Sequence, residues 1–253
     1  MSGTATPSGG VVPCRVLHWS APFGWLRKGW ADLCAAPLLS AAYGALIVLV
    51  SLAVAAIGWW LGRFALLAVL LSGFVFVAPL IGVGLYGIAR AHSRGGPAAF
   101  GDTLRLAKRV VGQAAVFALG QMVILLLWSR AGLMVNAFVP IEDGSLRSLL
   151  EFLAIGSALG SVFAAFTFAV TAFSLPLIAD RDVDMVTAAI SSVNAVLRNK
   201  PAALVWAALI VLLTALGLAT VFLGLALVMP WLAYAAWHGY RETLDAADWP
   251  LLD

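Results

Sequence analysis

The chain has 253 residues, of which 63% are hydrophobic and only 11% are charged, and its formal net charge is +3. Soluble domains carry about 25% charged residues, so this composition excludes a protein whose whole surface faces water. The apolar runs are continuous and about 20 residues long, which suits membrane-crossing helices, whereas a membrane β-barrel needs short alternating segments. The sequence therefore predicts an all-α membrane protein.

The chain is expected to begin with a disordered tail. Residues 1–10 are rich in Ser, Gly and Thr and contain neither a basic residue nor an apolar core, so they do not resemble a signal peptide. We assign residues 1–19 to this N-terminal tail, residues 20–242 to a six-span transmembrane domain and residues 243–253 to a C-terminal tail.

Apolar runs predict six transmembrane helices, at residues 40–61, 64–89, 112–128, 152–178, 202–218 and 220–238. The last two come from one stretch without Lys, Arg, Asp or Glu, residues 202–240. A single helix of that length would measure roughly 58 Å at 1.5 Å per residue, but the hydrocarbon core of a bilayer is only about 30 Å thick. We therefore expect two short spans with a turn near residues 217–220.

Lys and Arg residues are distributed unequally between the two sides of these spans. Twelve of the 15 lie in the N-terminal tail, the second and fourth loops and the C-terminus, and three lie in the other loops, namely Arg63, Arg130 and Arg147. The positive-inside rule then places both termini in the cytoplasm. Because the basic residues flank apolar runs and form no patch interleaved with aromatic residues, they do not indicate nucleic-acid binding.

A short segment with the spacing of an amphipathic helix precedes each pair of spans, and we call these three segments the leaders. They end at the helix breakers Pro37, Gly112 and Pro201, and Ser20 and either Asp182 or Asp184 are predicted N-terminal caps. A basic amphipathic helix beside a span is expected to lie in the cytoplasmic membrane interface, and packing into a cytoplasmic layer is the alternative. The predicted apolar stripes are Phe23, Leu26, Trp30 and Leu33; Phe100, Leu104, Ala107 and Val111; and Val186, Ile190, Val193 and Leu197.

Three prolines, Pro79, Pro176 and Pro230, recur near the predicted cytoplasmic ends of the second, fourth and sixth spans. Together with the leaders they predict three pseudo-repeats, each made of a leader and a hairpin of spans. A proline within a span kinks the helix, and neighbouring helices tolerate the kink. We favour that interpretation over an unwound binding site. The repeats cover residues 20–95, 96–181 and 182–242.

The six span cores contain no Asp, Glu, Lys, Arg or His. Ion-coupled transporters place such groups there, so a proton-coupled carrier is not expected. His18, His92 and His238 lie at span ends, where we expect them in the interface rather than on a metal or haem. The segment Asp180-Arg181-Asp182-Val183-Asp184 is interpreted as a helix-capping loop rather than a cation site. No nucleophile, metal or phosphate-binding motif appears in the sequence.

Together these motifs resemble a bacterial family of predicted integral membrane proteins, domain-of-unknown-function family 2189. The resemblance runs from about Phe23 to Tyr240 and implies a six-span inner-membrane protein without an assigned activity. It is carried by Gly29-Trp30, Asp32-Leu33, Pro37, Ser40, Tyr43-Gly44, Val77-Ala78-Pro79-Leu80, Leu85-Tyr86, Ala89-Arg90, Gly101-Asp102, Ser174-Leu175-Pro176-Leu177, Asp180-Arg181, Val183-Asp184, Ala195-Val196, Asn199, Val228-Met229-Pro230, Trp237-His238 and Tyr240-Arg241.

Some members of that family carry an automatic label of cytochrome c oxidase subunit I. A haem–copper core, as known for that enzyme family, is held by six intramembrane histidines, and the three peripheral histidines here do not supply them. The second leader also departs from the family pattern, since it reads Ala-Phe-Gly-Asp where the family has Ser-Leu-Gly-Asp. We therefore expect no cofactor and no metal.

These observations predict a multi-pass protein of the bacterial inner membrane that is not an enzyme and has no catalytic residues. Its leaders would organise lipid or partner proteins, and a homo-oligomer is one such partner. The alternative is a channel or carrier for a neutral or lipid-like solute. The candidate structural or functional positions are Trp30, Pro37, Pro79, Arg90, Pro176, Asp180, Arg181, Pro230, Trp237 and Arg241.

Overall fold

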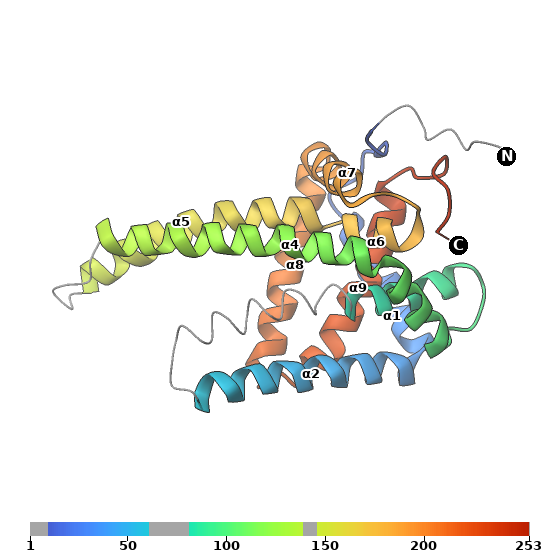
Figure 1. Ribbon diagram of the computed structural model, residues 1–253, viewed down its shortest axis with the longest axis horizontal. Coiled ribbons are helices and arrows are strands. Elements are labelled where there is room, and N and C mark those ends of the chain that lie inside the picture. Colours follow the sequence, from blue (N-terminus) through green and yellow to red (C-terminus); the bar gives the residue numbers. More distant parts are fainter. Residues whose placement is uncertain (1–9, 61–80, 139–145, 253) are drawn as a thin grey trace.

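The computed structural model describes residues 10–60, 81–138 and 146–252, and this part of the chain is mostly helical and contains no strand. A further helical segment occupies residues 81–93, and we call it the 81–93 helix. The labelled helices are α1 (Ala21–Ala35), α2 (Pro37–Trp60), α4 (Phe100–Phe138), α5 (Leu146–Thr171), α6 (Ser174–Asp180), α7 (Met185–Arg198), α8 (Lys200–Ala219) and α9 (Leu225–Thr243) (Figure 1).

Four stretches of the described helices are long and apolar enough to cross a membrane: Pro37–Ile57, Phe100–Met134, Ala154–Asp180 and Lys200–Ala219. They correspond to the predicted first, third, fourth and fifth spans. Most of the predicted second span lies outside the described residues. The predicted sixth span falls on α9, which is not one of these four stretches and buries about half of its residues against α1, α2 and α8. An all-α membrane protein is therefore confirmed, but six spans are not.

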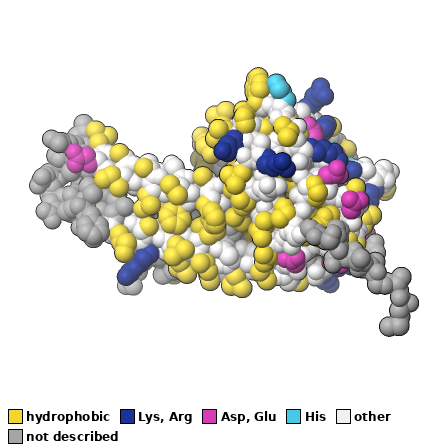
Figure 2. All heavy atoms as spheres, turned by 90° about the horizontal axis from the view of Figure 1, so that it is seen from above, with side chains coloured by type: hydrophobic (Ala, Val, Ile, Leu, Met, Phe, Trp, Pro, Cys, Tyr) yellow, Lys and Arg dark blue, Asp and Glu magenta, His cyan; other side chains and the backbone are white. Residues whose placement is uncertain are grey.

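The helices lie in three levels in Figure 1. The paired α4 and α5 form one long arm, α2 lies opposite them, and α8 and α9 run between the two at a steep angle to both. The arrangement of the three predicted hairpins as a parallel repeat stays a prediction, because most of the second span lies outside the described residues. Charged side chains gather around the end of the molecule that holds the two termini, while hydrophobic side chains cover much of the α4–α5 arm (Figure 2).

A single residue separates two of the leaders from the apolar helices that follow them. Ala36 lies between α1 and α2, and Asn199 lies between α7 and α8. Pro37 is the first residue of α2 and Pro201 lies in the first turn of α8, positions where a missing N–H removes no helical hydrogen bond. These two predicted breakers therefore begin helices, as their chemistry favours.

The second leader does not end at its predicted breaker. Helix α4 continues through Gly112 without interruption, from Phe100 to Phe138. A single glycine in a helix costs only about 1 kcal/mol relative to alanine, and the good helix formers on both sides of Gly112 outweigh that cost. The prediction of a break at Gly112 was therefore wrong, and the leader and span form one helix.

The predicted fourth span is interrupted just before Pro176. Helix α5 ends at Thr171, and α6 begins at Ser174. A proline ring collides with the carbonyl four residues before it, which kinks or breaks the preceding turn, and here the turn is interrupted. The hydroxyl of Ser192 in α7 bridges this break, because it accepts from the Phe173 N–H at 3.1 Å and donates to the Ala169 carbonyl at 2.7 Å. A buried serine thus satisfies the backbone groups that the proline frees.

The long uncharged stretch forms two helices, as predicted. Helix α8 ends at Ala219, α9 begins at Leu225, and the turn between them lies a few residues later than expected. Val221 and Phe222 have positive φ angles of 54° and 67° in this turn. Thr220 fastens it, because its hydroxyl donates to the Gly217 carbonyl at 2.8 Å and accepts from the Gly224 N–H at 2.6 Å.

The described parts of the two termini lie side by side (Figure 1). The Arg15 N–H donates to the Thr243 carbonyl at 2.8 Å, and the buried Val12 donates its N–H to the Ser191 hydroxyl at 2.9 Å. Residues 10–19 are therefore fastened to the fold, although their composition had placed them in a disordered tail. Composition cannot detect hydrogen bonds to residues so distant along the chain.

Asp184 is the N-terminal cap of α7, since its carboxylate accepts from the N–H groups of Val186 at 2.9 Å and Thr187 at 3.0 Å. These hydrogen bonds to the Thr187 and Val186 backbone lower the pKa of Asp184. We expect Asp184→Ala to lower the free energy of unfolding by about 1 kcal/mol, the usual value of a cap, and this stabilisation to disappear as the pH falls through the lowered pKa. Unfolding followed by tryptophan fluorescence in detergent measures both effects.

Ser20 offers the matched control for that substitution. It occupies the position before α1 but makes no capping hydrogen bond, and its hydroxyl instead lies 2.8 Å from Nδ1 of His18. Ser20→Ala should therefore change the free energy of unfolding by no more than about 0.5 kcal/mol, as expected at a surface site. Equal losses in the Ser20 and Asp184 variants would contradict the capping role.

Candidate functional site

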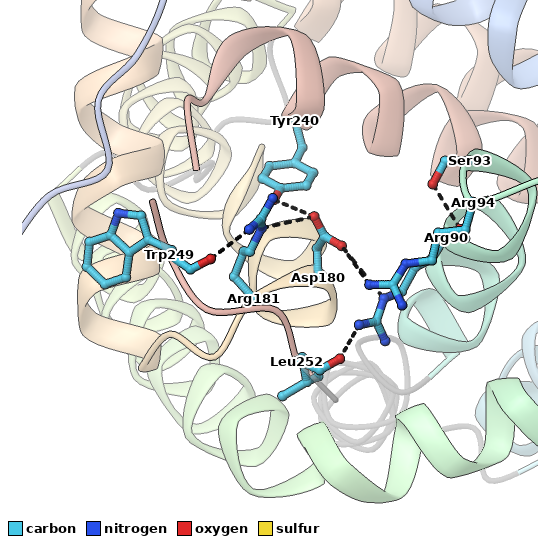
Figure 3. A network of polar contacts seen from close by, with 8 residues as sticks. All are labelled: Arg90, Ser93, Arg94, Asp180, Arg181, Tyr240, Trp249 and Leu252. Atoms are coloured by element: carbon cyan, nitrogen blue, oxygen red, sulfur yellow. Dashed lines mark hydrogen bonds and ion pairs between the residues drawn. The ribbon is translucent and has the colours of Figure 1, made fainter. Parts of the chain in front are cut away.

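A nearly buried carboxylate, that of Asp180, is the centre of a polar network at the end of the molecule that holds the termini (Figure 3). Three guanidinium groups surround it: its oxygens lie 3.6 Å from Nε of Arg90, 3.4 Å from Nε of Arg181 and 3.9 Å from a terminal nitrogen of Arg94. The Tyr240 hydroxyl donates a hydrogen bond to the same carboxylate at 2.9 Å. We call these five residues the Asp180 network.

Four separate parts of the chain supply the Asp180 network and its supports. The 81–93 helix and the turn after it carry Arg90 and Arg94, α6 ends at Asp180, and α9 supplies Tyr240. The fourth part is the C-terminal segment, which comes close enough for Arg181 to donate to the Trp249 carbonyl at 2.6 Å. The network therefore joins elements that are far apart in the sequence.

The C-terminal segment is fastened to the network by its backbone as well. The Leu252 N–H donates to the Asp180 carbonyl at 3.0 Å, and the Asp182 N–H donates to the Pro250 carbonyl at 3.0 Å. Arg90 also donates to the Leu252 carbonyl. Hydrogen bonds on both sides thus hold residues 249–252 against the end of α6.

Three positive groups lie within 4 Å of the Asp180 carboxylate, so the charges of the network offset one another. Burial raises the pKa of the Tyr240 hydroxyl, and the nearby Asp180 charge raises it further. Tyr240 therefore keeps its proton and acts as a donor. Because the carboxylate contacts three guanidinium groups and a tyrosine donor from separate parts of the chain, the arrangement suits structural cohesion.

A second carboxylate, that of Asp32 in α1, lies between two imidazole rings. Its oxygens lie 2.7 Å from Nε2 of His238 in α9 and 3.4 Å from Nδ1 of His92 in the 81–93 helix. All three side chains are mostly buried, with 14 to 20% of their surface exposed. The sequence had placed both histidines separately in the interface, because nothing in their spacing indicates that they share a partner.

Aromatic rings fill the space between these two clusters. Trp237 stacks on Tyr86 with ring centroids 6.4 Å apart and meets Tyr240 edge-on at 5.7 Å. On the other side of α9, Trp25 of α1 contacts Trp206 of α8 at 5.6 Å. Trp25, Trp206 and Trp237 are almost completely buried, so this end of the molecule has a well-packed aromatic core.

Each leader has exposed apolar residues on one face of its helix. A different face of the same helix packs against the rest of the protein. In α7 the exposed residues Val186, Ile190 and Leu197 lie on the predicted stripe, but the buried face holds Ser191 and Ser192 together with Met185, Ala188 and Ala195. The first turns of α4 show the same arrangement. There Phe100, Leu104 and Val111 are exposed, while Thr103, Leu106 and Val110 are buried.

Helix α1 follows this arrangement with one difference. Its buried face holds Trp25, Leu26 and Gly29, so Leu26 of the predicted stripe is inside, whereas Phe23 and Trp30 are exposed. The three leaders therefore each have two apolar faces, one against the protein and one directed away from it. The sequence predicts a single apolar stripe on each leader, whereas the structure shows two apolar faces.

Two cavities, of about 620 Å³ and about 630 Å³, open between the apolar helices. Residues of α2, α8 and α9 contribute to the first, and residues of α4 and α5 to the second. Both are lined mainly by apolar side chains. Gln121, Thr167 and Thr171 are the polar exceptions in the second cavity, and the amide nitrogen of Gln121 is buried there without a hydrogen-bond partner among the described residues.

Comparison with known families adds one finding to this geometry. Residues 66–180 match the family model DUF2189, a predicted integral membrane protein. This match confirms the predicted family resemblance over that region. Comparisons with curated proteins and with solved structures gave no match.

The DUF2189 region contains three members of the Asp180 network, Arg90, Arg94 and Asp180, and it ends at Asp180. Its proline Pro176 lies in the first turn of α6 and is buried. Pro79 also belongs to the region but lies outside the described residues. Arg181 follows directly after the region and is also part of the network.

The remaining candidate positions lie outside the DUF2189 region and do not form one site. Trp237 contacts Tyr240 of the network, and Pro230 is buried inside the continuous α9. Pro37 and Arg241 are exposed, at the start of α2 and near the end of α9, and Trp30 packs edge-on against Trp231. Sequence reasoning missed Asp32, Arg94 and the C-terminal segment, since each gains its role only through contacts distant in the sequence.

Proposed function

We propose that this protein is a non-enzymatic, multi-pass protein of the bacterial inner membrane that organises lipid or partner proteins through its leaders. The observation that carries the proposal is the outward apolar face of each leader. A surface of this kind is unfavourable in water and favourable in the membrane interface, where amphipathic helices bury their apolar face.

Basic residues accompany these outward faces. In α4 the exposed Leu104 is next to Arg105, and in α7 the exposed Leu197 is next to Arg198, which is exposed as well. Apolar residues flanked by Lys and Arg are the usual composition of helices that lie along an anionic membrane surface. The composition of the leaders thus supports a lipid partner.

The positions of the leaders in the fold support the same proposal. The one-residue junctions at Ala36 and Asn199 keep α1 and α7 next to the first turns of α2 and α8, where an apolar helix enters the membrane. The described ends of the chain lie together, as expected when both termini are on one side. The excess of basic residues on that side favours the cytoplasm.

The polar clusters support a non-enzymatic role. In the described residues, the Asp180 network pairs one acid with arginines and a tyrosine donor, and Asp32 pairs with two histidines. Covalent catalysis needs a nucleophile within hydrogen-bond reach of a base. Neither cluster presents that pairing, so both are interpreted as joints between helices.

Site-directed spin labelling tests where the leaders lie. In a background with Cys14→Ser and Cys34→Ser, single labels at Phe23, Leu104 and Ile190 are compared in lipid vesicles for accessibility to oxygen and to a water-soluble nickel reagent. Because the outward faces are apolar, we expect depths of about 5–10 Å below the headgroup boundary, as for interfacial helices.

Two further labels calibrate that measurement. Val162 is exposed within the α5 span and should report the bilayer interior, whereas the exposed Asp182 should report water. Labels on the leaders that match the Asp182 value would contradict the proposal and favour a cytoplasmic layer. Labels that are protected from both reagents would indicate a protein partner instead of lipid.

The second cavity favours a second candidate function, a carrier or channel for a neutral or lipid-like solute. Its support is the polar group Gln121, which is directed into an otherwise apolar cavity with its amide nitrogen unsatisfied among the described residues. Pro176 and Pro230 are not among the residues that line it. Mass spectrometry of small molecules that copurify in mild detergent tests this candidate, and loss of a bound solute in Gln121→Leu would support it.

A further inference from the structure

One face of α1 carries an exposed row of aromatic and basic side chains. Phe23, Arg27 and Trp30 are spaced by four and three residues, which places them on the same side of the helix, and all three are exposed. Trp19, just before the helix, extends the row, since its ring meets Phe23 edge-on with centroids 6.5 Å apart. Half of the Trp19 surface is exposed, which is unusual for a tryptophan in water.

The N-terminal segment brings a second group of basic residues next to this row. The Leu17 N–H donates to Oδ1 of Asn199 at 2.7 Å, and the Asn199 amide donates to the Arg15 carbonyl at 3.0 Å. The junction of α7 and α8 is thereby fastened to residues 15–17, so its exposed cations Arg198 and Lys200 lie beside the start of the aromatic row.

The charge on this surface is positive. Arg15 and Lys28 form exposed ion pairs with Asp245 and Glu242, at 3.0 Å and 3.1 Å. The other three basic residues of this surface are Arg27, Arg198 and Lys200. Within the described part of the chain, none of them forms an ion pair. Three positive charges therefore stand next to exposed aromatic rings without local neutralisation.

We infer that this surface, formed by Trp19, Phe23, Arg27, Arg198 and Lys200, binds the headgroup of an anionic phospholipid. The inference rests on the interfacial placement of the leaders proposed above, and it adds the class of lipid and the residues that select it. Tryptophan rings settle at headgroup depth, guanidinium groups match the geometry of phosphate oxygens, and each basic residue near an anionic surface strengthens binding about fivefold.

Two groups of residues in this surface have separate tasks. The aromatic rings insert beside the headgroup of any phospholipid, so they contribute to affinity without regard to lipid charge. The three unpaired cations distinguish an anionic headgroup from a zwitterionic one. Substitutions in the two groups should therefore have different effects, and this difference makes the inference testable.

Native mass spectrometry of the full-length protein in a neutral detergent provides the test. The protein is titrated with equal amounts of phosphatidylglycerol and phosphatidylcholine of identical acyl chains. We expect at least a tenfold preference for phosphatidylglycerol, which the triple variant Arg27→Gln, Arg198→Gln, Lys200→Gln reduces to about equal binding. Trp19→Ala with Phe23→Ala should weaken both lipids to a similar degree.

The matched control removes the same amount of charge from α4. Lys108→Gln, Arg109→Gln and Arg130→Gln also change exposed residues and should keep the preference for phosphatidylglycerol. Equal loss in both triple variants would show a general charge effect and overturn the inference, as would equal binding of both lipids by the unmodified protein. If the spin labels lie at interface depth while this preference is absent, only the present inference fails.

Discussion

Asp180→Asn is expected to lower the free energy of unfolding by about 3–5 kcal/mol, the largest effect of any single substitution discussed for this protein. The substitution leaves the charges of Arg90 and Arg181 nearly buried without the carboxylate that balances them. It also removes the carboxylate beside Arg90 and Arg181, the two side chains that donate to the C-terminal segment. The midpoint of unfolding in a detergent series, followed by tryptophan fluorescence, measures the loss.

Two other variants make the result for Asp180 specific. Asp182→Asn also removes one negative charge, two residues away and at an exposed position. The free energy of unfolding should therefore change by no more than about 0.5 kcal/mol. Tyr240→Phe removes only the hydrogen bond to the carboxylate and should cost about 1.5–3 kcal/mol, the usual value for a bond to a charged group. A loss for Asp180→Asn no greater than that for Asp182→Asn would show that the network does not hold the fold together.

Gly44→Ala is expected to separate α2 from α9 and to cost about 3 kcal/mol, at the upper end of the range for overpacking. A methyl group at this position would overlap the carbonyl group of Ala226, and backbone atoms cannot move aside as a flexible side chain can. Thermal unfolding in detergent measures the loss of stability. Disulfide trapping between α2 and α9 would show directly whether their distance has changed.

Gly24→Ala is the control for this steric argument. Gly24 lies within α1, and an added methyl group there would meet no atom within 4 Å. Alanine is favoured over glycine inside a helix by about 0.5–1 kcal/mol, so this variant should be slightly more stable than the original. Equal destabilisation by the Gly24 and Gly44 variants would contradict close contact between α2 and α9 as the cause.

These two effects locate the rigid part of the molecule. Gly44 allows α2 to approach α9, Asp180 joins α6 to α9 through Tyr240, and α1 packs along the same helix through its buried face. Helix α9 is therefore the element on which α1, α2, α6 and α8 assemble. This role explains why a helix that the sequence predicted as a lipid-exposed span buries so much of its surface.

Several features could be predicted because their causes are local. The Asp184 cap depends on N–H groups two and three residues away. A distortion near Pro176 follows from its ring, although the helix is interrupted there and not only kinked. The turn between α8 and α9 follows from the length of an uncharged stretch compared with the thickness of a bilayer. Each of these causes lies within a few residues or in the composition itself.

The inward face of the leaders could not be predicted in the same way. The apolar stripe of α7 was expected to face the membrane interface, and its residues Val186 and Ile190 are exposed, but nothing in the sequence indicated that Ser191 and Ser192 would be buried. The two serines lie inside because they satisfy backbone groups at Val12 and at the break before α6. Periodicity alone shows that a helix has an apolar face but not whether protein or lipid covers that face.

The sequence by itself determined that this protein lies in a membrane. A chain with 11% charged residues and long apolar runs has a surface that must be in contact with lipid. It also identified Arg90, Asp180 and Arg181 as positions of interest, through a family resemblance. Only the tertiary structure decided that these residues meet each other and Tyr240, and that Asp32 holds two histidines from different helices. The physical reason is that ion pairs form between charges that the fold brings within 4 Å of each other. The separation of these residues along the chain does not predict that distance.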